Sequence, residues 1–331
     1  MTTEERKVFW DTLCSVNGEN LEFDIKRLTE KIQYPRFLYR FRHISVPTID
    51  ALQTNRLYFS KANGYDDPFD TLIKIDFRLL NKYASEFFSK DDLFEKMDIF
   101  CKTLAIPEAI RINAENILKS TSIENIVNGI NTFLKANIRP LLQQSLWSVC
   151  FSESSTNENM WLKYADQYNG FCVIYDLENE EKRLCGKQEK CKNCVVNTAG
   201  VSLYPMYYSD VRYDATEYAR SLTIACIAQS FLPPEIANLI IQSLPNAAWE
   251  QERITLIKSK CHEYDGEWRM LLRSNSQGPI MQEWIPHGVI LGLRTTERDK
   301  KLIIRSAKLA GIECLYQLII DDDNELDIKE V

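Results

Sequence analysis

This chain contains few of the side chains that enzymes most often use. Its three histidines, His43, His262 and His287, form no His-x-x-x-His doublet, and no Gly-x-Ser-x-Gly elbow occurs. A zinc-protease motif and a hydrolase elbow are therefore excluded. Arginine, serine, glutamate and aromatic side chains remain as the residues that could do chemistry.

Hydroxyls and aromatic rings are concentrated in one stretch. It begins as Cys150-Phe-Ser-Glu-Ser-Ser, an apolar strand whose end carries Ser152 and Ser154. A helical turn follows, in which Trp161 and Tyr164 lie three residues apart and share a face. The serines are either turn formers or pocket hydroxyls. The two rings are either part of the core or a platform on which a planar ligand stacks.

A carboxylate occurs inside a later strand, Gly266-Glu-Trp-Arg-Met-Leu-Leu-Arg. Period-two alternation places Trp268 on one face and Glu267 with Arg269 on the other. Charges in a strand otherwise suited to burial are costly unless they are paired or used. Glu267 is therefore either the ion-pair partner of Arg269 or a carboxylate that stabilises positive charge in a cleft.

An early strand poses the same question for arginine. In Arg36-Phe-Leu-Tyr-Arg-Phe-Arg, alternation places Tyr39 and Phe41 on one face and Arg40 and Arg42 on the other. An inward-facing arginine either belongs to a core ion pair or anchors a phosphate or ribose-linked group.

The composition is typical of a soluble globular protein, with 45% hydrophobic and 26% charged residues among 331. A net charge of −7 disfavours broad nucleic-acid binding, although a local basic patch stays open. Ten cysteines and a polar start without a secretory leader predict a cytoplasmic protein with reduced thiols. The most apolar region, Leu222–Leu244, contains Pro233 and Pro234, so no membrane span is expected.

Three cysteines, Cys185, Cys191 and Cys194, lie in a lysine-rich segment, the last two at Cys-x-x-Cys spacing. A structural zinc usually takes four ligands. A fourth is not evident nearby, although Cys172 or Cys226 could fold back. Zinc, a redox-sensitive loop and a disulfide remain alternatives.

Strands and helices are predicted in blocks along a single domain, 1–331. We expect a β-rich core made of 36–78, 146–213 and 262–320. Two helical insertions are expected at 81–144 and 214–261, and an acidic tail at 321–331. Within the core, 70–78 is predicted to be a strand. Because helical blocks interrupt the strands instead of alternating with them, the pattern predicts an α+β fold and not a doubly wound parallel sheet.

Seven short motifs occur in an order that resembles the bacterial family named domain of unknown function 2971. They are Leu38-Tyr-Arg-Phe-Arg, Leu57-Tyr-Phe-Ser, Asp66-Asp-Pro-Phe-Asp, Cys150-Phe-Ser-Glu, Met160-Trp-Leu-Lys-Tyr-Ala-Asp, Gly170-Phe-Cys-Val and Gly266-Glu-Trp-Arg. The resemblance covers roughly residues 36 to 320, without the helical insertions. The family name implies no activity.

A second resemblance does imply one. An arginine on the first strand, a Ser-x-Ser strand end, an aromatic helix and a late glutamate follow the order found in ADP-ribosyltransferases. The resemblance implies a split mixed or antiparallel β core. It also implies that Arg40, with Arg42 beside it, anchors NAD, and that Ser152 or Ser154 supports the nicotinamide ribose. Trp161 and Tyr164 would line the same pocket.

The same resemblance assigns catalytic roles to two carboxylates. Glu267 would bind the ribose 2′-hydroxyl and stabilise an oxocarbenium-like transition state. Asp265 stands where the common Glu-x-Glu pattern has its first glutamate, and would activate the acceptor. NAD is then a substrate and no metal is expected, since the pyridinium leaving group needs no general acid. The acceptor would be a macromolecule, protein or nucleic acid, and the setting a bacterial toxin or an anti-phage effector.

Three alternatives stand beside ADP-ribosyl transfer. An NAD glycohydrolase would use water as the acceptor. A non-enzymatic module would bind a nucleotide-like signal with Arg40, Trp161 and Tyr164, while the helical insertions contact a regulatory partner protein. A nuclease-like enzyme would hold a metal with three acids of one turn, Asp66, Asp67 and Asp70, which otherwise cap or tie that turn.

Overall fold

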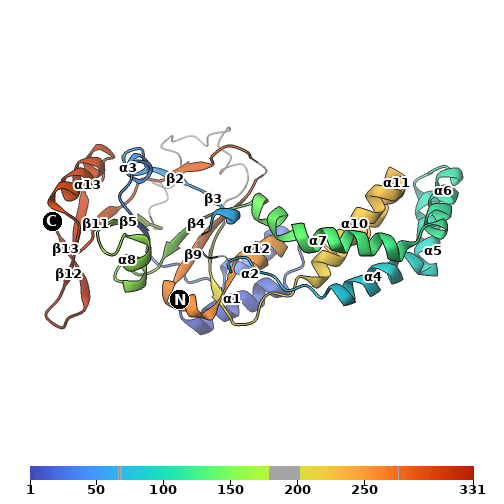
Figure 1. Cartoon of the computed structure of the whole chain (residues 1–331), viewed down its shortest axis with the longest axis horizontal. Coiled ribbons are helices and arrows are strands. Elements are labelled where there is room, and N and C mark those ends of the chain that lie inside the picture. Colours follow the sequence, from blue (N-terminus) through green and yellow to red (C-terminus); the bar gives the residue numbers. More distant parts are fainter. Residues whose placement is uncertain (66, 68, 179–201, 275) are drawn as a thin grey trace.

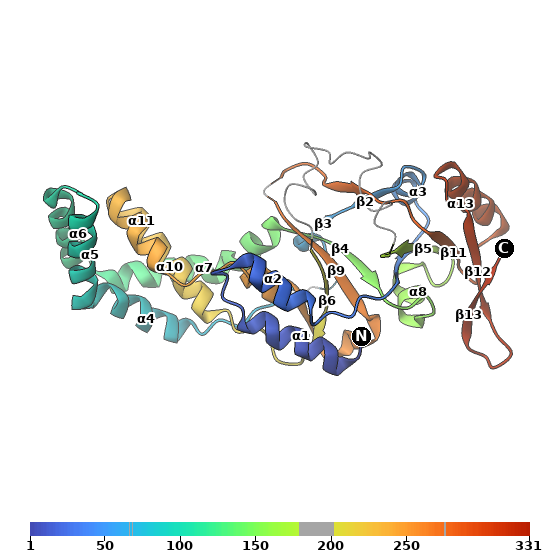
Figure 2. The same ribbon diagram turned by 180° about the vertical axis from the view of Figure 1, so that it is seen from behind.

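The computed structural model describes residues 1–65, 67, 69–178, 202–274 and 276–331. A β-sheet with flanking helices forms one part of the elongated molecule, and a helical arm extends from it (Figure 1). The C-terminus lies at the end of the molecule opposite the arm, as the reverse view also shows (Figure 2). No helix within these ranges combines the length and apolarity that crossing a bilayer requires.

The strands occur throughout the chain. They are β1 (Phe37–Arg42), β2 (Arg56–Tyr58), β3 (Ser60–Lys61), β4 (Leu146–Ser152), β5 (Phe171–Asp176), β6 (Ser202–Pro205), β7 (Tyr207–Tyr208), β8 (Ile257–Lys258), β9 (Glu267–Arg273), β10 (Met281–Glu283), β11 (Gly288–Leu291), β12 (Cys314–Ile320) and β13 (Leu326–Glu330).

The helices form blocks between them. They are α1 (Thr3–Ser15), α2 (Leu21–Thr29), α3 (Val46–Gln53), η1 (Ala62–Gly64), α4 (Phe77–Ser89), α5 (Asp91–Thr103), α6 (Glu108–Ser120), α7 (Ile123–Ser145), α8 (Glu158–Tyr164), α10 (Thr216–Phe231), α11 (Pro234–Ser243), α12 (Glu250–Thr255), η3 (Lys260–Asp265) and α13 (Glu297–Leu309).

The main sheet has nine strands in the described part of the chain. Its order is β13-β12-β11-β5-β1-β4-β9-β6, and β3 is a further partner of β4. Only the β11–β12 pairing in this sheet is parallel, with α13 as the crossover between the two strands. The sheet is therefore mixed, which confirms the coarse prediction of strands and helical blocks in an α+β arrangement.

Alternation along the strands divides the apolar side chains between the two faces of the sheet. Leu38 lies in the larger core, which also contains apolar residues of α1, α2, α3 and α13. Phe41 lies on the opposite face and packs against Trp161 of α8. The predicted alternation of β1 is thus correct, and it places Arg40 and Arg42 on the face of Leu38.

One edge of β4 has two partners that diverge. β1 pairs with β4 at Ser152, whereas β3 pairs with it at Ser148 and Trp147. The other edge of β4 is paired with β9 along its whole length. The sheet is therefore open between β1 and β3, beside Cys150 on β4.

Helices α4 to α7 of the first predicted insertion and α10 and α11 of the second pack together and form the single arm seen in Figure 1. The end of the second predicted insertion, with Trp249, Leu256 and Ile257, belongs to the core of the sheet. α10 contacts both α4 and α7. The arm has its own apolar core, separate from the core of the sheet. The core of the arm includes Phe88, Met97, Leu118, Ile227 and Ile236. The sequence pattern identified both helical blocks, but it gave no sign that they form one unit.

The predicted strand at 70–78 is wrong. Ile73, Ile75 and Phe77 do alternate, and they pack beneath the arm. However, Lys74 makes only an isolated bridge to Asp214, and Asp76 caps α4 by accepting hydrogen bonds from the backbone N–H groups of Arg78 and Leu79. The helix cap therefore ends the extended segment before a strand forms.

The predicted acidic tail at 321–331 is only partly a tail. Residues 326–330 form β13, which pairs antiparallel with β12 and extends the sheet. Leu326 and Ile328 alternate with charged residues and pack against the core on the α8 face. Their period-two spacing was the available signal, and the density of acidic residues obscured it.

Gly170 provides a test of the packing that fixes β1. A Cβ at this position would lie 2.1 Å from the carbonyl oxygen of Arg42, so only glycine permits the observed approach. We expect Gly170→Ala to lower the free energy of unfolding by about 2 kcal/mol or more. Gly129 in α7 is the control, because a Cβ there meets nothing within 4 Å. Gly129→Ala should stabilise the protein by up to about 1 kcal/mol in urea unfolding. Equal effects of the two substitutions would contradict this account.

Candidate functional site

A cleft of about 190 Å³ opens where β1 and β3 diverge from β4. Its walls come from segments that are far apart in the sequence. The lining residues are Tyr39, Arg40, Phe41, Arg42, Ser60, Gly64, Tyr65, Asp67, Asp70, Ser148, Cys150, Phe151, Met160, Tyr164, Lys258, Asp265, Glu267 and Arg269. Two predicted catalytic carboxylates and both predicted arginines therefore reach one cavity.

Glu267 on β9 is held by two cations. Its Oε2 accepts a hydrogen bond from Lys258 Nζ at 2.8 Å, and its Oε1 accepts one from Arg269 Nε at 2.6 Å. Burial alone would raise the pKa of Glu267, but the charges of Arg269 and Lys258 outweigh it and hold that pKa well below its usual range. The carboxylate is therefore ionised at neutral pH.

Arg269 is fully buried and joins three segments. Its Nη1 and Nη2 donate to the two carboxylate oxygens of Asp70 at 3.0 and 2.5 Å, and Nη1 also donates to the carbonyl of Thr255 at 2.8 Å. The Tyr65 ring lies 4.9 Å from the guanidinium carbon, and its hydroxyl is hydrogen bonded to Ser148. The turn that contains Asp70 is thereby tied to the sheet.

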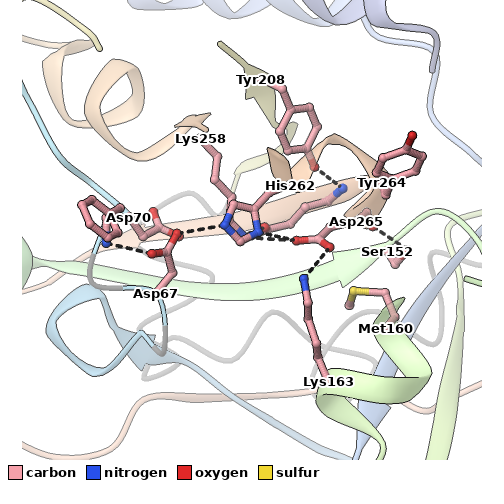
Figure 3. A network of polar contacts seen from close by, with 12 residues as sticks. Asp67, Asp70, Ser152, Met160, Lys163, Tyr208, Lys258, His262, Tyr264 and Asp265 are labelled. Atoms are coloured by element: carbon pink, nitrogen blue, oxygen red, sulfur yellow. Dashed lines mark hydrogen bonds and ion pairs between the residues drawn. The ribbon is translucent and has the colours of Figure 1, made fainter. Parts of the chain in front are cut away.

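Asp265 forms a second charged centre beside the first, drawn in Figure 3. Its Oδ2 lies 3.3 Å from both Lys258 Nζ and His262 Nδ1, and its Oδ1 lies 3.9 Å from Lys163 Nζ. The other ring nitrogen of His262 faces Asp67 at 3.3 Å. Because Lys258 contacts both Asp265 and Glu267, one lysine connects the two predicted catalytic carboxylates.

Arg40 and Arg42 present the opposite situation. No carboxylate within the described ranges forms an ion pair with either; Arg40 donates to the carbonyl of Tyr58 at 3.3 Å. Burial, together with the adjacent Arg40, lowers the pKa of Arg42 to about 9. Two neighbouring cations without a counter-charge are costly, and an anion bound between them would remove that cost.

Cys150 lies on the cleft floor, with its side chain accessible from the cleft. Desolvation raises the pKa of its thiol to about 12, and the negative charge of Glu267 acts in the same direction. The thiol is therefore protonated at neutral pH. Because the thiolate is the nucleophile in cysteine catalysis, this site does not resemble that of a cysteine enzyme.

Neither predicted serine is among the residues that line the cleft. Ser152 is completely buried and does not line the cleft; its hydroxyl donates to the carbonyl of Asp265 at 2.8 Å. Ser154 turns the chain, and its hydroxyl accepts from the backbone N–H of Thr156 at 3.3 Å. Both are strand-end residues that shape the backbone, and Ser152 positions the segment that carries Asp265.

The two aromatic residues of α8 have different environments. Trp161 is completely buried, donates through Nε1 to the carbonyl of Ser155, and packs edge-on against Phe41. It is a core residue and no ligand platform. Tyr164 does line the cleft, and burial raises the pKa of its hydroxyl to about 12.

Lys258 was not singled out from the sequence. It lies in a segment predicted to be helical, and the structure places it in the two-residue strand β8.

Asp70 was considered from the sequence as a metal ligand or as a tie for its turn. Its bonds to Arg269 bear out the tie, and they argue against the nuclease alternative. Asp66 lies outside the described residues.

Metal binding is not established by the structure. No group of three or more His, Cys, Asp or Glu side chains with metal-site geometry occurs within the described ranges. Cys185, Cys191 and Cys194 lie outside those ranges, so the alternatives raised for them stay predictions.

Comparisons with protein-family models, curated protein sequences and solved structures found no match for this chain. The two family resemblances therefore remain expectations from the sequence. The geometry of the cleft is the basis for any functional proposal.

The ion pairs of Glu267 predict how stability depends on pH. Since its pKa is lower in the folded than in the unfolded protein, the stabilisation is complete above the unfolded-state pKa of about 4.3 and is lost as the pH falls below it. We expect the free energy of unfolding to fall more steeply below pH ~4.3 in the wild type than in Glu267→Gln. The difference should reach up to about 1.4 kcal/mol per pH unit in urea titrations. Parallel curves for the two proteins would contradict the assignment.

The unpaired arginines predict an unusual mutational result. Arg42→Met removes a cation that has no counter-charge in the described part of the chain, so we expect it to raise the melting temperature by about 2 °C or more. We also expect added pyrophosphate to stabilise the wild type by binding between the two arginines, and Arg42→Met to abolish that effect. Arg78→Met, on the first turn of α4 and outside the cleft, should leave the pyrophosphate effect unchanged. A destabilised Arg42→Met protein that still responds to pyrophosphate would show that Arg42 is structural.

Proposed function

We propose that this protein binds NAD in the cleft, breaks the bond between nicotinamide and ribose, and transfers ADP-ribose to a macromolecular acceptor. The proposal rests on one observation: the same cavity is lined by one ionised glutamate and by two arginines that have no counter-charge among the described residues. The arginines suit the pyrophosphate of NAD. The carboxylate suits the positive charge that develops on the ribose when nicotinamide departs.

The proposed reaction needs little proton transfer. The C1′–N bond breaks, and its electron pair leaves with nicotinamide, which thereby becomes neutral. The acceptor attacks C1′ and loses a proton. Asp265 is the proposed positioning group for the acceptor, because it lines the cleft beside Lys163, whose side chain is half exposed.

Water as the acceptor would make the protein an NAD glycohydrolase, and this alternative uses the same residues.

A different alternative is a nucleotide-sensing module without turnover. It is favoured by the fact that both oxygens of Glu267 already accept hydrogen bonds from cations. In that case the helical arm would be the region that contacts a regulatory partner, and bound nucleotide would persist unchanged.

Glu267→Gln tests whether Glu267 is catalytic, as both the transferase and the glycohydrolase require. The variant should fold, because Lys258 keeps Asp265 and Arg269 keeps Asp70 as partners. We expect nicotinamide release from NAD to fall by about 100-fold or more, since a neutral amide cannot stabilise the developing cation. Glu158→Gln, on α8 and outside the cleft lining, is the matched control.

The measurement is nicotinamide release by the full chain incubated with NAD, with and without cell extract. Labelled NAD then reports whether macromolecules are modified. Binding of NAD by calorimetry without any nicotinamide release from the wild type would favour the sensing module. Equal release by the wild type and Glu267→Gln would refute the catalytic role.

A further inference from the structure

A second cavity of about 310 Å³ shares Arg40 and Arg42 with the first. It is formed between α3, β2 and β5, on the face of the sheet where α3 packs. Its other lining residues are Pro47, Thr48, Asp50, Ala51, Leu52, Asn55, Arg56, Tyr58, Phe171, Val173, Tyr175 and Pro286. The two arginines therefore border both cavities.

The walls of this second cavity are largely apolar and include the rings of Phe171 and Tyr175. Such walls suit a flat, partly hydrophobic ring. Asp50 is the acidic residue of the wall; it is exposed and forms no ion pair with the arginines within the described ranges. The wall therefore leaves the charge of Arg40 and Arg42 uncompensated.

One polar group in the wall also lacks a partner. Asn55 Nδ2 donates to the carbonyl of Ala310 at 3.0 Å, whereas the Oδ1 atom of Asn55 is buried and has no hydrogen-bond partner among the described residues. A buried acceptor without a donor costs about 1–3 kcal/mol. Because this oxygen has almost no accessible surface, a ligand N–H or O–H group would remove that cost only after the Asn55 amide turned toward the cavity.

We propose that the second cavity binds the adenosine end of a pyrophosphate-linked dinucleotide, with the pyrophosphate between Arg40 and Arg42. This inference rests on the proposed function and assigns a binding site to the adenosine half of its substrate. The nicotinamide end then occupies the first cavity beside Glu267. When the Asn55 amide turns toward the cavity on binding, the amino group of the base or a ribose hydroxyl donates to its Oδ1.

The arrangement explains why two cavities share their cationic residues. A mononucleotide needs one ring pocket and one phosphate site, and would leave one cavity unused. A dinucleotide has its anionic group in the middle and a ring at each end. The order of the structural features is the same: ring-sized cavity, arginine pair, ring-sized cavity.

The test fills the second cavity without touching the first. Ala51→Phe on α3 adds a ring to the cavity wall, and Val46→Phe on the same helix is the control, because Val46 is 84% exposed and does not line the cavity. We expect Ala51→Phe to weaken binding of ADP-ribose and AMP by about tenfold or more in calorimetry. Nicotinamide mononucleotide should bind Ala51→Phe as tightly as it binds the wild type.

Asn55→Gly is the second variant, since glycine tolerates the positive φ of 54° at this position and removes the amide. It should also weaken ADP-ribose binding and spare nicotinamide mononucleotide. Thermal unfolding of each variant checks the fold. Wild-type affinity of both variants for ADP-ribose, or no binding of ADP-ribose by the wild type, would overturn the inference.

The two proposals fail in distinguishable ways. If ADP-ribose binding depends on Ala51 and Asn55 but NAD is not cleaved, the catalytic proposal fails and the dinucleotide subsite stands. If NAD is cleaved through Glu267 and the second-cavity variants cleave it with unchanged KM, the subsite fails and the catalytic proposal stands.

Discussion

The fully buried guanidinium of Arg269 is the interaction on which the cleft depends. It binds the carboxylates of Asp70 and Glu267 and the carbonyl of Thr255, and these groups belong to three separate segments of the chain. Each partner compensates part of the buried charge, so the loss of one destabilises the cleft wall while the remaining partners still hold the guanidinium. Assembly of the cleft wall is therefore cooperative.

The two sides of the cleft differ in how their charges are balanced. On the β9 side, Glu267, Lys258, Asp265 and Arg269 neutralise one another in a connected network. On the β1 side, Arg40 and Arg42 have no acidic partner in the described chain. A protein with a net charge of −7 has ample acidic residues to supply one. Unbalanced cations at a cavity are expected where a ligand supplies the missing charge.

The sequence predicted local structure far better than it predicted contacts. Alternation in β1 and β9 identified the correct faces for Arg40, Arg42 and Glu267, because the period of a strand is a local property. The burial of Ser152 and Trp161 could not be read in this way. Serine and tryptophan side chains both occur in pockets and in cores. The packing of α8 against β1 buries Trp161, and the hydrogen bond to the carbonyl of Asp265 holds Ser152 inside the protein.

Lys258 was missed for a related reason. It lies in a two-residue strand directly after α12, and its role comes from carboxylates seven and nine residues further along, which η3 folds back toward it. No periodicity marks such a short element. Glu267 was recognisable from strand alternation and Asp265 from the family resemblance, whereas the cation that connects them required the fold.

The close pairing of Glu267 limits the chemistry it can perform. Two cations that hold its pKa well below the usual range make it a poor proton acceptor, so it is unsuited to general-base catalysis at neutral pH. A fixed negative charge remains useful where positive charge develops without proton transfer. Departure of a pyridinium leaving group is a reaction of that kind, because the leaving group becomes neutral without protonation. The ion pairs of Glu267 therefore fit the proposed reaction, in which the ribose uses a carboxylate lone pair that neither Lys258 nor Arg269 occupies.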